Sequence, residues 1–506
     1  MLRNESELMG SSKTLIFLIS IIIVGFFLRI HYLHSDIPLM LDGLRYFFLG
    51  MDISILGNLP IGYDKTNIGW PLFLSIIFQN VQFENYLDYM TLQKMCSVIF
   101  STLTVIPMYF FIRKFLKDYL AVIGAAFFIF SPYVIENSVL GITDAFFIFL
   151  IVSFFALFFS HGKNNVIFSF FILGLSSIVR YESLLLIIPT TLIFLNRFKN
   201  QDNFKKSYFY GLVLFFVTII PIAVWKIQMG IPDGIVSHLG DGAYVLINEN
   251  SFNSFTSDRF DVIRGLINLP KFIGFSLLPF CFIFLPYTII TLLKKESNNF
   301  RYLFLMGIVS LIPALYAYGR GFEEIRYVFV IFPILILFGL YFIDKIILKT
   351  GKKYILTILF LVLIILSSTI YLDFRQTHYE REKEVLKIAE FVSKLDGDSN
   401  DYGPEAYYVE VMDLNEKEFP ILSNQIDFKS KIVSLDGQTI IEKINDAKHK
   451  GVSYLVVTSN SVDRTFLEVY NNEEEYAYLE KIFDSEENNS KFKVKIFKIN
   501  FAEFDS

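Results

Sequence analysis

The sequence has little charge and very few cysteines. Of its 506 residues, 19% are charged and two are cysteines. Both cysteines, Cys96 and Cys281, lie in apolar runs, which excludes a disulfide framework or a cysteine metal cluster. No basic patch interleaved with aromatic residues is present, which argues against nucleic acid as a partner. We also find no internal repeat and no long low-complexity tract.

What the sequence does have is apolar residues gathered in runs. Hydrophobic residues make up 54% of the chain, and 57 residues are phenylalanine. Runs of about 18 or more with almost no charge recur, each long enough to cross about 30 Å of hydrocarbon. We therefore expect a polytopic α-helical membrane protein with about eleven transmembrane helices. The predicted spans are 14–33, 92–112, 119–136, 143–160, 166–180, 183–196, 208–225, 272–293, 302–318, 326–343 and 354–371.

Lysine and arginine follow every second predicted span. The first span lacks a small-residue cleavage site, so we expect a retained helix rather than a signal peptide. By the positive-inside rule the N-terminus is cytoplasmic, and an odd number of spans then places the C-terminus outside the plasma membrane. The basic residues on the N-terminal side are Arg3, Lys13, Arg113, Lys114, Lys117, Lys163, Arg197, Lys199, Lys205, Lys206, Lys294, Lys295, Arg301, Lys345, Lys349, Lys352 and Lys353.

This topology predicts a transmembrane domain over residues 1–371 and an extracellular tail over residues 372–506. Two long loops, at about 34–91 and 226–271, also lie outside. In the tail, "KIVSLDGQTIIEKINDAKHKGVSYLVVTS" reads as strand, helix and strand, and "KFKVKIFKI" alternates like a strand. The acidic run "NNEEEYAYLEKIFDSEENN" reads as a solvated helix and loop. We expect a small extracytoplasmic α/β domain.

The first outer loop contains "PLMLDGLRYFFLG", which places Asp42 and Arg45 among aromatic residues. The spacing after Gly43 is helical, as in a helix lying at the membrane surface. On residue pattern alone, Asp42 and Arg45 form a weak exposed pair worth about 0–1 kcal/mol.

Three further outer turns also contain ionisable residues. A charge at the hydrocarbon edge is costly unless it is paired or hydrated. Helix-end capping explains any one of these turns alone, but together they indicate a site for an anionic ligand, because arginine donates two hydrogen bonds at once to a phosphate. The residues are Glu136 and Asp144 in "SPYVIENSVLGITDAFF", Arg180, Tyr181 and Glu182 in "GLSSIVRYESLLL", and Arg320, Glu323, Glu324 and Arg326 in "YAYGRGFEEIRYVFV".

With these motifs in this order, the chain resembles the GT-C class of membrane glycosyltransferases. The likeness covers about residues 14–371 and points to the protein O-mannosyltransferase and aminoarabinose-transferase branch, with archaeal relatives most similar. It rests on "LDGLRYFFLGMDI", "NIGWPLFLSII", "SPYVIENSVLGITDAFFIF", "GLSSIVRYESLLLIIP" and "EIRYVFVIFPILIL". The WWD-type tail motif of oligosaccharyltransferases is absent, which argues against transfer of a whole glycan to asparagine.

The resemblance implies transfer of mannose or another hexose from a polyprenyl or dolichyl phosphate carrier to an acceptor outside the membrane. The acceptor is a protein, a glycan or a lipid. The acid of the family's first outer loop corresponds to Asp42, which would be the general base of an inverting reaction, with Arg45, Tyr181 and Glu182 in support. Arg180, Arg326 and Arg320 would bind the donor phosphate. The family often has a second acid where this chain has Gly43, so Glu136 or Asp144 is a candidate replacement.

Two alternatives stay open at this stage. A divalent metal has possible oxygen ligands in Asp42, Glu136 and Asp144, but no dense ligand motif supports it, and we expect no cofactor. A transporter or flippase of lipid-linked sugars is the main alternative function. Transporters usually place charges near the midplane and contain repeated halves, whereas these charges lie at the outer ends of the spans. A sensor with an outer binding domain would leave the charged turns unexplained.

Overall fold

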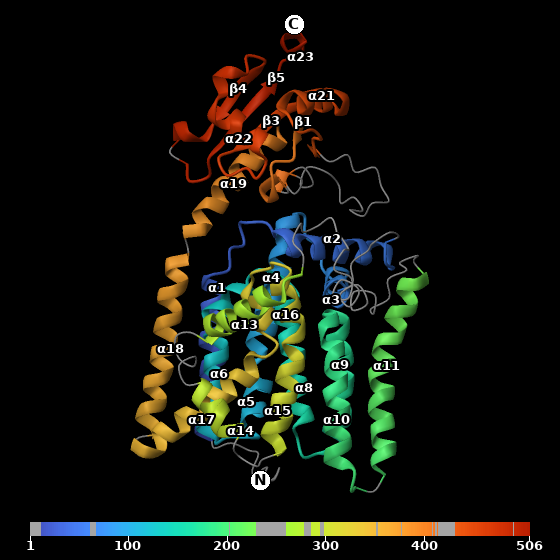
Figure 1. Cartoon of the computed structure of the whole chain (residues 1–506), viewed down its shortest axis with the longest axis vertical. Helices are drawn as coiled ribbons and strands as arrows, with labels where there is room; N and C mark the ends of the chain where they lie inside the picture. The colour runs from blue at the N-terminus through green and yellow to red at the C-terminus, as the bar shows by residue number, and fades with distance from the viewer. Residues whose placement is uncertain are drawn as a thin grey trace. The chain divides into compact units, whose positions relative to one another are not determined.

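The structure is a computed structural model, and its described residues form two compact units (Figure 1). Unit 1 comprises Met1–Leu33, Leu56–Ile77 and Gln93–Leu372. Unit 2 comprises His34–Ile55, Phe78–Leu92 and Asp373–Ser506. The described residues are 12–60, 67–201, 203–228, 260–277, 285–293, 298–350, 353–375, 377–406, 408–409, 412, 431–488 and 490–505.

The described part of unit 1 is built from helices. Its elements are α1 (Ser12–His31), α3 (Gly69–Phe78), α4 (Tyr86–Leu103), α5 (Val105–Arg113), α6 (Asp118–Ile129), α7 (Pro132–Ser138), α8 (Asp144–Phe158), α9 (Lys163–Val179), η2 (Tyr181–Leu186), α10 (Ile187–Phe198), α11 (Phe204–Gln228), α13 (Val262–Leu277), α14 (Leu285–Leu293), α15 (Asn298–Ser310), α16 (Ile312–Gly319), η3 (Ile325–Val328), α17 (Phe332–Thr350) and α18 (Lys353–Arg375). The last residue of α3, the start of α4 up to Leu92 and the end of α18 from Asp373 belong to unit 2.

These helices follow from the apolar runs, because a backbone in hydrocarbon must satisfy its hydrogen bonds internally. Among the described residues, five helical segments are long and apolar enough to cross a membrane, or six if the bent pair α6 and α7 counts as one span. The five are Thr14–His31, Tyr86–Arg113, Phe204–Gln228, Asn299–Gly319 and Ile355–Ser393. The prediction of a helical membrane protein is therefore confirmed, while the total of eleven spans stays a prediction.

Several predicted spans are broken. The axes of α6 and α7 differ by 53°, and Pro132 at the start of α7 accounts for the break because it cannot donate a backbone hydrogen bond. The predicted spans 183–196 and 326–343 begin with the 3₁₀ turns η2 and η3 rather than with regular helix. The helix α13 begins at Val262, within the predicted second outer loop, and residues 229–259 of that loop lie outside the described residues. So do residues 278–284 of the predicted span 272–293.

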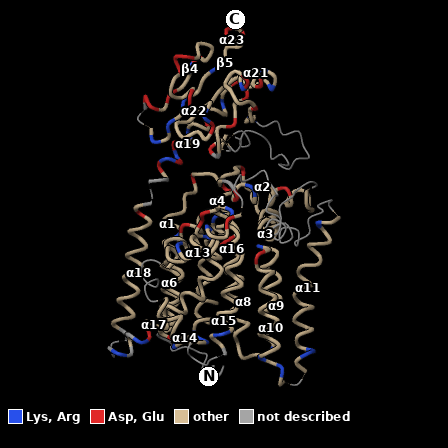
Figure 2. Tube along the Cα trace, in the orientation of Figure 1, with Lys and Arg blue, Asp and Glu red and all other residues tan. Residues whose placement is uncertain are grey.

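Basic residues gather at one end of several helices of unit 1 (Figure 2). After α5, Arg113 pairs with Asp118 at 3.0 Å, and Lys117 lies 3.9 Å from Asp344. Near the end of α10, Arg197 donates to the carbonyl oxygens of Phe158, the last residue of α8, and of Ser160 just beyond it. This pattern is the one from which the sequence predicts a cytoplasmic N-terminus, and that orientation stays a prediction.

Unit 2 contains a five-stranded mixed sheet in the order β2-β1-β3-β5-β4. The parallel strands are β2 (Ile432–Val433), β1 (Asp398–Asn400) and β3 (Val452–Thr458); β5 (Val494–Ile499) pairs antiparallel with β3 and with β4 (Leu479–Asp484). Its helices include α2 (Leu41–Leu56), α19 (Thr377–Ser393), α21 (Ile440–Lys450), α22 (Arg464–Asn471) and α23 (Phe501–Phe504), with short 3₁₀ turns η4 (Pro404–Ala406), η5 (Glu473–Glu475) and η6 (Ser485–Asn488). The predicted C-terminal α/β domain is thus confirmed as a fold.

One prediction for the tail was wrong. The acidic run read as helix and loop contains the edge strand β4, because Leu479 and Phe483 pack on the apolar core of unit 2 while charged residues between them face outward. Charged side chains on an edge strand discourage pairing with another chain. The helix α21 ends at Lys450, and Gly451 caps it with φ +76°.

The first outer loop belongs mostly to unit 2. Ile37 and Met40, just before α2, pack in an apolar cluster with residues of α19 that include Val385 and Ile388. Asp36 accepts a hydrogen bond from Tyr379 at 2.7 Å and lies 3.1 Å from the Lys383 ammonium. The segment around Asp42 therefore forms one compact unit with the tail, whereas the sequence suggested a boundary at residue 371. The division of the chain into two functional domains at residue 371 stays a prediction.

Candidate functional site

A cluster of five charged side chains lies in unit 1, and Asp144 is at its centre. Asp144 is the first residue of α8 and is only 2% exposed. Its Oδ1 accepts a hydrogen bond from Nη1 of Arg180, and its Oδ2 accepts one from Asn137 Nδ2 at 3.1 Å. An isolated carboxylate at this depth would be costly, so these partners explain how an acid is held inside an apolar body.

Arg180 lies between two carboxylates. It follows the last residue of α9 in an extended conformation, which turns its side chain away from the helix and toward α8. Its Nε and Nη2 donate to Glu182 Oε1 at 3.1 and 2.6 Å. The guanidinium also lies over the ring of Phe147, 5.5 Å from the centroid. Arg180 is therefore fixed from three sides by Asp144, Glu182 and Phe147.

Arg326 is the second cation of the cluster. Its Nη1 lies 3.9 Å from Asp144 Oδ2, and its Nε pairs with Glu324. Residues of α8, η2, α15, α16 and η3 enclose a cavity of about 20 Å³ between the two arginines, room for about one water molecule. The cluster holds two arginines and three carboxylates. Because the side chain of Arg326 is 21% exposed and that of Arg180 is 11%, Arg326 is the more accessible cation.

The turn that presents Asp144 is held by two buried donors. Gly141 has φ +69°, a conformation that favours glycine. Its carbonyl oxygen accepts hydrogen bonds from Trp70 Nε1 at 3.1 Å and from Gln93 Nε2 at 2.7 Å. Both donor residues are fully buried. The side chains of α3 and α4 therefore set where α8 begins.

The turn that presents Arg180 is fixed in a similar way. The backbone N–H of Tyr181 donates to Asn67 Oδ1 at 3.3 Å. The hydroxyl oxygens of Ser176 and Ser177, at the end of α9, each lie 3.0 Å from that of Ser183 in η2. These contacts explain why Tyr181 and Glu182 belong to the site: they form the 3₁₀ turn that follows Arg180.

Asp42 and Arg45 lie in α2 of unit 2, whereas the cluster around Asp144 belongs to unit 1. Asp42 is half-buried in the first turn of α2, and Arg45 is exposed. The predicted helix after Gly43 is present. Its buried face includes Phe47 and also Asp52, which is 2% exposed, so Asp52 does not lie on a solvated side of α2.

The remaining predicted residues lie outside the cavity. Glu136 is half-buried on α7, and Arg320 follows the last residue of α16. Neither lines the cavity next to Asp144. No group of three His, Cys, Asp or Glu side chains within the described part of the chain could hold a metal ion. That finding concerns geometry alone, and the expectation of no cofactor stays a prediction.

Some residues of the site were missed from the sequence. Asn137 and Gly141 both lie in the motif "SPYVIENSVLGITDAFF", but neither is ionisable. The pattern of charges in this motif therefore predicted only Glu136 and Asp144 as site residues. Trp70, in the motif "NIGWPLFLSII", is fully buried rather than at an interface. A polar residue within an otherwise apolar span, such as Gln93 at the start of the second predicted span, was the signal that could have pointed to this contact.

Comparison with known proteins matches residues 90–225 to the family described as dolichyl-phosphate-mannose-protein mannosyltransferase. No curated protein matches the sequence. Among solved structures, ArnT from Cupriavidus metallidurans in the apo state is 10% identical, with a TM-score of 0.58 over 97% of this chain and 98% of that one. The same protein bound to undecaprenyl phosphate has a TM-score of 0.57, 10% identity, and coverage of 98% and 99%.

A second solved protein has the same fold. The archaeal oligosaccharyltransferase AglB from Archaeoglobus fulgidus, in complex with an inhibitory peptide and a dolichol-phosphate, is 12% identical with a TM-score of 0.53. That match covers 96% of this chain and 74% of AglB. The archaeal character of this chain stays a prediction. The resemblance drawn from the sequence is confirmed: the chain has the fold of the GT-C membrane glycosyltransferases, and residues 90–225 match their mannosyltransferase family.

Proposed function

We propose that the protein transfers a hexose-type sugar, such as mannose, from a polyprenyl or dolichyl phosphate carrier to an acceptor at the outer face of the membrane. The observation that carries the proposal is the cluster of Arg180 and Arg326 around Asp144, set in a GT-C fold. Two similar proteins support the donor class, since ArnT binds undecaprenyl phosphate and AglB binds a dolichol-phosphate. The chain's many apolar helices suit a donor whose lipid tail stays in the bilayer.

In the proposed reaction an acceptor hydroxyl attacks the anomeric carbon of the sugar, and the bond from that carbon to the phosphate oxygen breaks. Inversion follows from attack opposite the leaving group. The proton of the hydroxyl passes to the carboxylate of Asp42. The leaving polyprenyl phosphate gains negative charge, and a guanidinium stabilises charge that develops there. We assign this role first to Arg326, which is the more exposed of the two arginines of the cluster, and to Arg180 beside it.

The carboxylates of the cluster have a separate part in this proposal. Asp144, Glu182 and Glu324 fix the planes of the two guanidiniums before the donor arrives. A guanidinium that is already fixed does not have to move when negative charge develops on the phosphate. It therefore stabilises that charge better than a mobile guanidinium would. The buried Oε2 of Glu182 makes no hydrogen bond to the described residues, and so it offers an acceptor for one hydroxyl of the sugar. Arg320 and Arg45 are assigned to the approach of the donor.

The acceptor is proposed to be a protein, a glycan or a lipid. The complex of AglB with an inhibitory peptide makes a protein acceptor the first to test. The α/β tail is the part of unit 2 proposed to select the acceptor, because it forms one unit with the segment that contains Asp42.

The experiment follows consumption of labelled polyprenyl-phosphate sugars by purified protein in liposomes, with and without a chelator. Asp42→Asn should lower turnover by about 10²–10⁴-fold, the usual contribution of a general base. Asp88→Asn is the matched control, because Asp88 is an exposed aspartate in the first turn of α4 and in the same unit. The chelator should leave turnover unchanged. Equal turnover of Asp42→Asn and Asp88→Asn would remove the base assignment.

The same liposomes separate the enzyme from a flippase. Donor consumption by the wild type alone establishes a transferase. Movement of intact labelled lipid across the bilayer, without consumption of any donor, would instead assign the protein to transport of lipid-linked sugars.

A further inference from the structure

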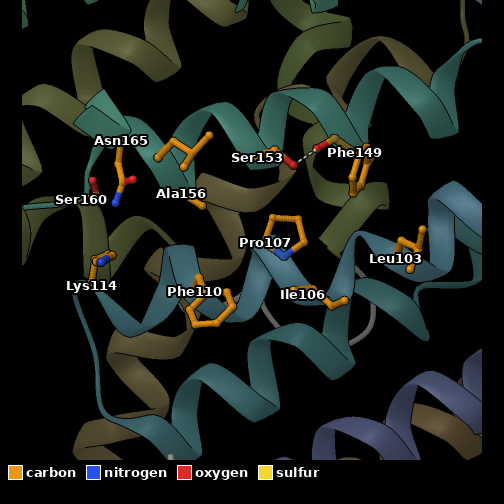
Figure 3. A pocket seen from close by; sticks show the side chains of 11 residues that line it. Leu103, Ile106, Pro107, Phe110, Lys114, Phe149, Ser153, Ala156, Ser160 and Asn165 are labelled. Atoms are coloured by element: carbon orange, nitrogen blue, oxygen red, sulfur yellow. Dashed lines mark hydrogen bonds between the residues drawn. The ribbon is translucent and has the colours of Figure 1, made fainter. Parts of the chain in front are cut away.

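An open groove runs between α5 and α8 of unit 1 (Figure 3). Its volume is about 580 Å³, within the range of roughly 300–1,000 Å³ that small-molecule sites occupy. The lining residues include Ile106, Pro107, Phe110, Lys114, Phe149 and Ala156. Most of them are apolar, so the groove suits a hydrocarbon chain.

The groove exists because small side chains face each other where the two helices run side by side. Pro107 on α5 lies across from Ser153 and Ala156 on α8, and none of them fills the gap (Figure 3). The Ser153 hydroxyl donates to the carbonyl oxygen of Phe149 at 2.7 Å, so it does not need a ligand. On the rim, Ile106 and Phe110 are 44% and 41% exposed, as expected for side chains that face lipid.

The length of the groove corresponds to one leaflet. Leu103 and Lys114 lie at its two ends on the α5 side, eleven residues apart in sequence. At 1.5 Å per residue this is about 16 Å. The hydrocarbon core of a bilayer is about 30 Å thick, so one leaflet supplies about half of that. A single lipid chain in one leaflet is therefore long enough to extend along the whole groove.

The polar groups of the groove gather at one end. Lys114 lies opposite Ser160 and Asn165, and no other charged residue lines the groove among the described residues (Figure 3). This end is also where the basic residues of unit 1 gather, including Arg113 and Lys117. A lysine ammonium and an amide at the mouth of an apolar groove match a negatively charged headgroup on a hydrocarbon chain.

The groove is distinct from the proposed donor site. Asp144 is the first residue of α8, and Ser160 lies just beyond its last residue, so the polar ends of the two sites are at opposite ends of this helix. Asp144 and Ser153 are nine residues apart, which places them about 180° apart around a helix with 3.6 residues per turn. A phosphate held by Arg326 therefore faces away from the groove.

We propose that the groove between α5 and α8 binds an anionic phospholipid of the surrounding membrane, with one chain along Ile106, Pro107 and Ala156 and the phosphate at Lys114. The lipid occupies the leaflet that contains the basic ends of the helices. It fills the space between α5 and α8 and so stabilises the start of α9 beside the end of α8. This inference concerns a bound lipid and does not depend on the proposed reaction.

The test is native mass spectrometry of the detergent-purified full chain, titrated with dioleoyl phosphatidylglycerol or dioleoyl phosphatidylcholine. The wild type should retain the anionic lipid about fivefold better, because one basic side chain near a lipid surface contributes about 1 kcal/mol. Lys114→Gln should remove this preference. Lys206→Gln is the matched control, since Lys206 is exposed on α11 and does not line the groove.

A second pair of variants tests the groove itself. Ala156→Phe should reduce retention of both lipids because the ring fills the channel, whereas Ser153→Ala keeps it open and should retain both. Equal retention of the two lipids by the wild type, or an unchanged preference in Lys114→Gln, would overturn the proposal. So would displacement of phosphatidylglycerol by an equal amount of polyprenyl phosphate, because that would make the groove part of the donor site.

Discussion

Arg180 and Asp144 form a buried ion pair between the end of α9 and the start of α8, although they are 36 residues apart in sequence. The pair is the centre of the charged cluster of unit 1. Removing one partner of such a pair leaves an uncompensated charge in a poorly solvated place. This relationship gives the first prediction.

Asp144→Ala should destabilise the protein by about 3–5 kcal/mol, the usual cost of breaking a buried pair. Arg180 keeps Glu182 as a partner, so the lower end of that range is expected. The double variant Asp144→Ala with Arg180→Met leaves Glu182 without its arginine, and it should lose less stability than the sum of the two single losses because Asp144 and Arg180 interact directly. Thermal unfolding in detergent measures both. If the double variant loses as much stability as Asp144→Ala and Arg180→Met lose together, the two side chains are not coupled.

The second prediction concerns the turn before Asp144. Gly141→Ala should cost about 1–2 kcal/mol, because φ +69° is unfavourable for a residue with a Cβ. Gly141→Asn is the matched comparison and should cost less, since asparagine tolerates this conformation. Trp70→Phe should cost about 1 kcal/mol through the lost hydrogen bond to the Gly141 carbonyl.

The three variants should also lower consumption of the labelled donor, because they move Asp144 and with it Arg180. Equal thermal stability of Gly141→Ala and Gly141→Asn would show that the turn is not strained by a side chain at this position.

The third prediction concerns the packing of α9 on α11. A Cβ at Gly174 would lie 1.9 Å from Thr218 Oγ1 and 2.9 Å from the Phe215 carbonyl oxygen. Small residues let membrane helices approach closely, so Gly174 is needed for this contact. Gly174→Ala should cost about 1–3 kcal/mol through overpacking. Thr218→Ala in the same chain should restore part of that loss, while Thr218→Ala alone should be mild. A loss in the double variant equal to that of Gly174→Ala would mean that the strain lies elsewhere.

Much of this architecture could be predicted from the sequence, because the apolar runs and the strand and helix patterns of the tail are local signals. Asp144, Arg180 and Arg326 were singled out as charges at the ends of spans, and the structure brings these three together. The acids that pair with the two arginines were harder to predict. Glu182 was predicted as a supporting residue and Glu324 only as an acid of its turn, and each pairs with the arginine two residues away, Arg180 or Arg326.

Three features could not be predicted for physical reasons. The contact of Trp70 and Gln93 with the Gly141 carbonyl joins residues 71 and 48 positions apart, and no local pattern encodes it. The strand β4 was hidden because charged residues dominate an edge strand, where pairing to β5 outweighs local preference. The 3₁₀ turn η2 follows Arg180 and the 3₁₀ turn η3 contains Arg326, and hydropathy alone reports neither turn.

The last prediction concerns pH and the sheet of unit 2. Asp463 precedes α22, where its Oδ1 accepts from the backbone N–H and the hydroxyl of Thr465, and its Oδ2 lies 2.9 Å from the buried Lys443 ammonium. Burial alone would raise the pKa of Asp463, but the hydrogen bonds from Thr465 and Lys443 outweigh it, so the pKa is lowered from its ordinary value of 3.8. A carboxyl whose pKa is lower in the folded state stabilises the fold at higher pH.

This contribution is complete above the pKa of the unfolded chain and is lost as pH falls through the lower pKa of the folded state. Protection of β3 against hydrogen exchange, corrected for the intrinsic rate at each pH, should therefore fall in the wild type as the pH drops below the ordinary aspartate pKa of 3.8. Asp463→Asn keeps the helix cap but has no charge to lose, so its protection should be lower at pH 6 and flatter with pH. Asp505→Asn is the control, since Asp505 pairs with Lys448 on the surface and is 52% exposed. An identical pH dependence in Asp463→Asn and the wild type would show that the Asp463 and Lys443 pair does not set the acid stability of the sheet.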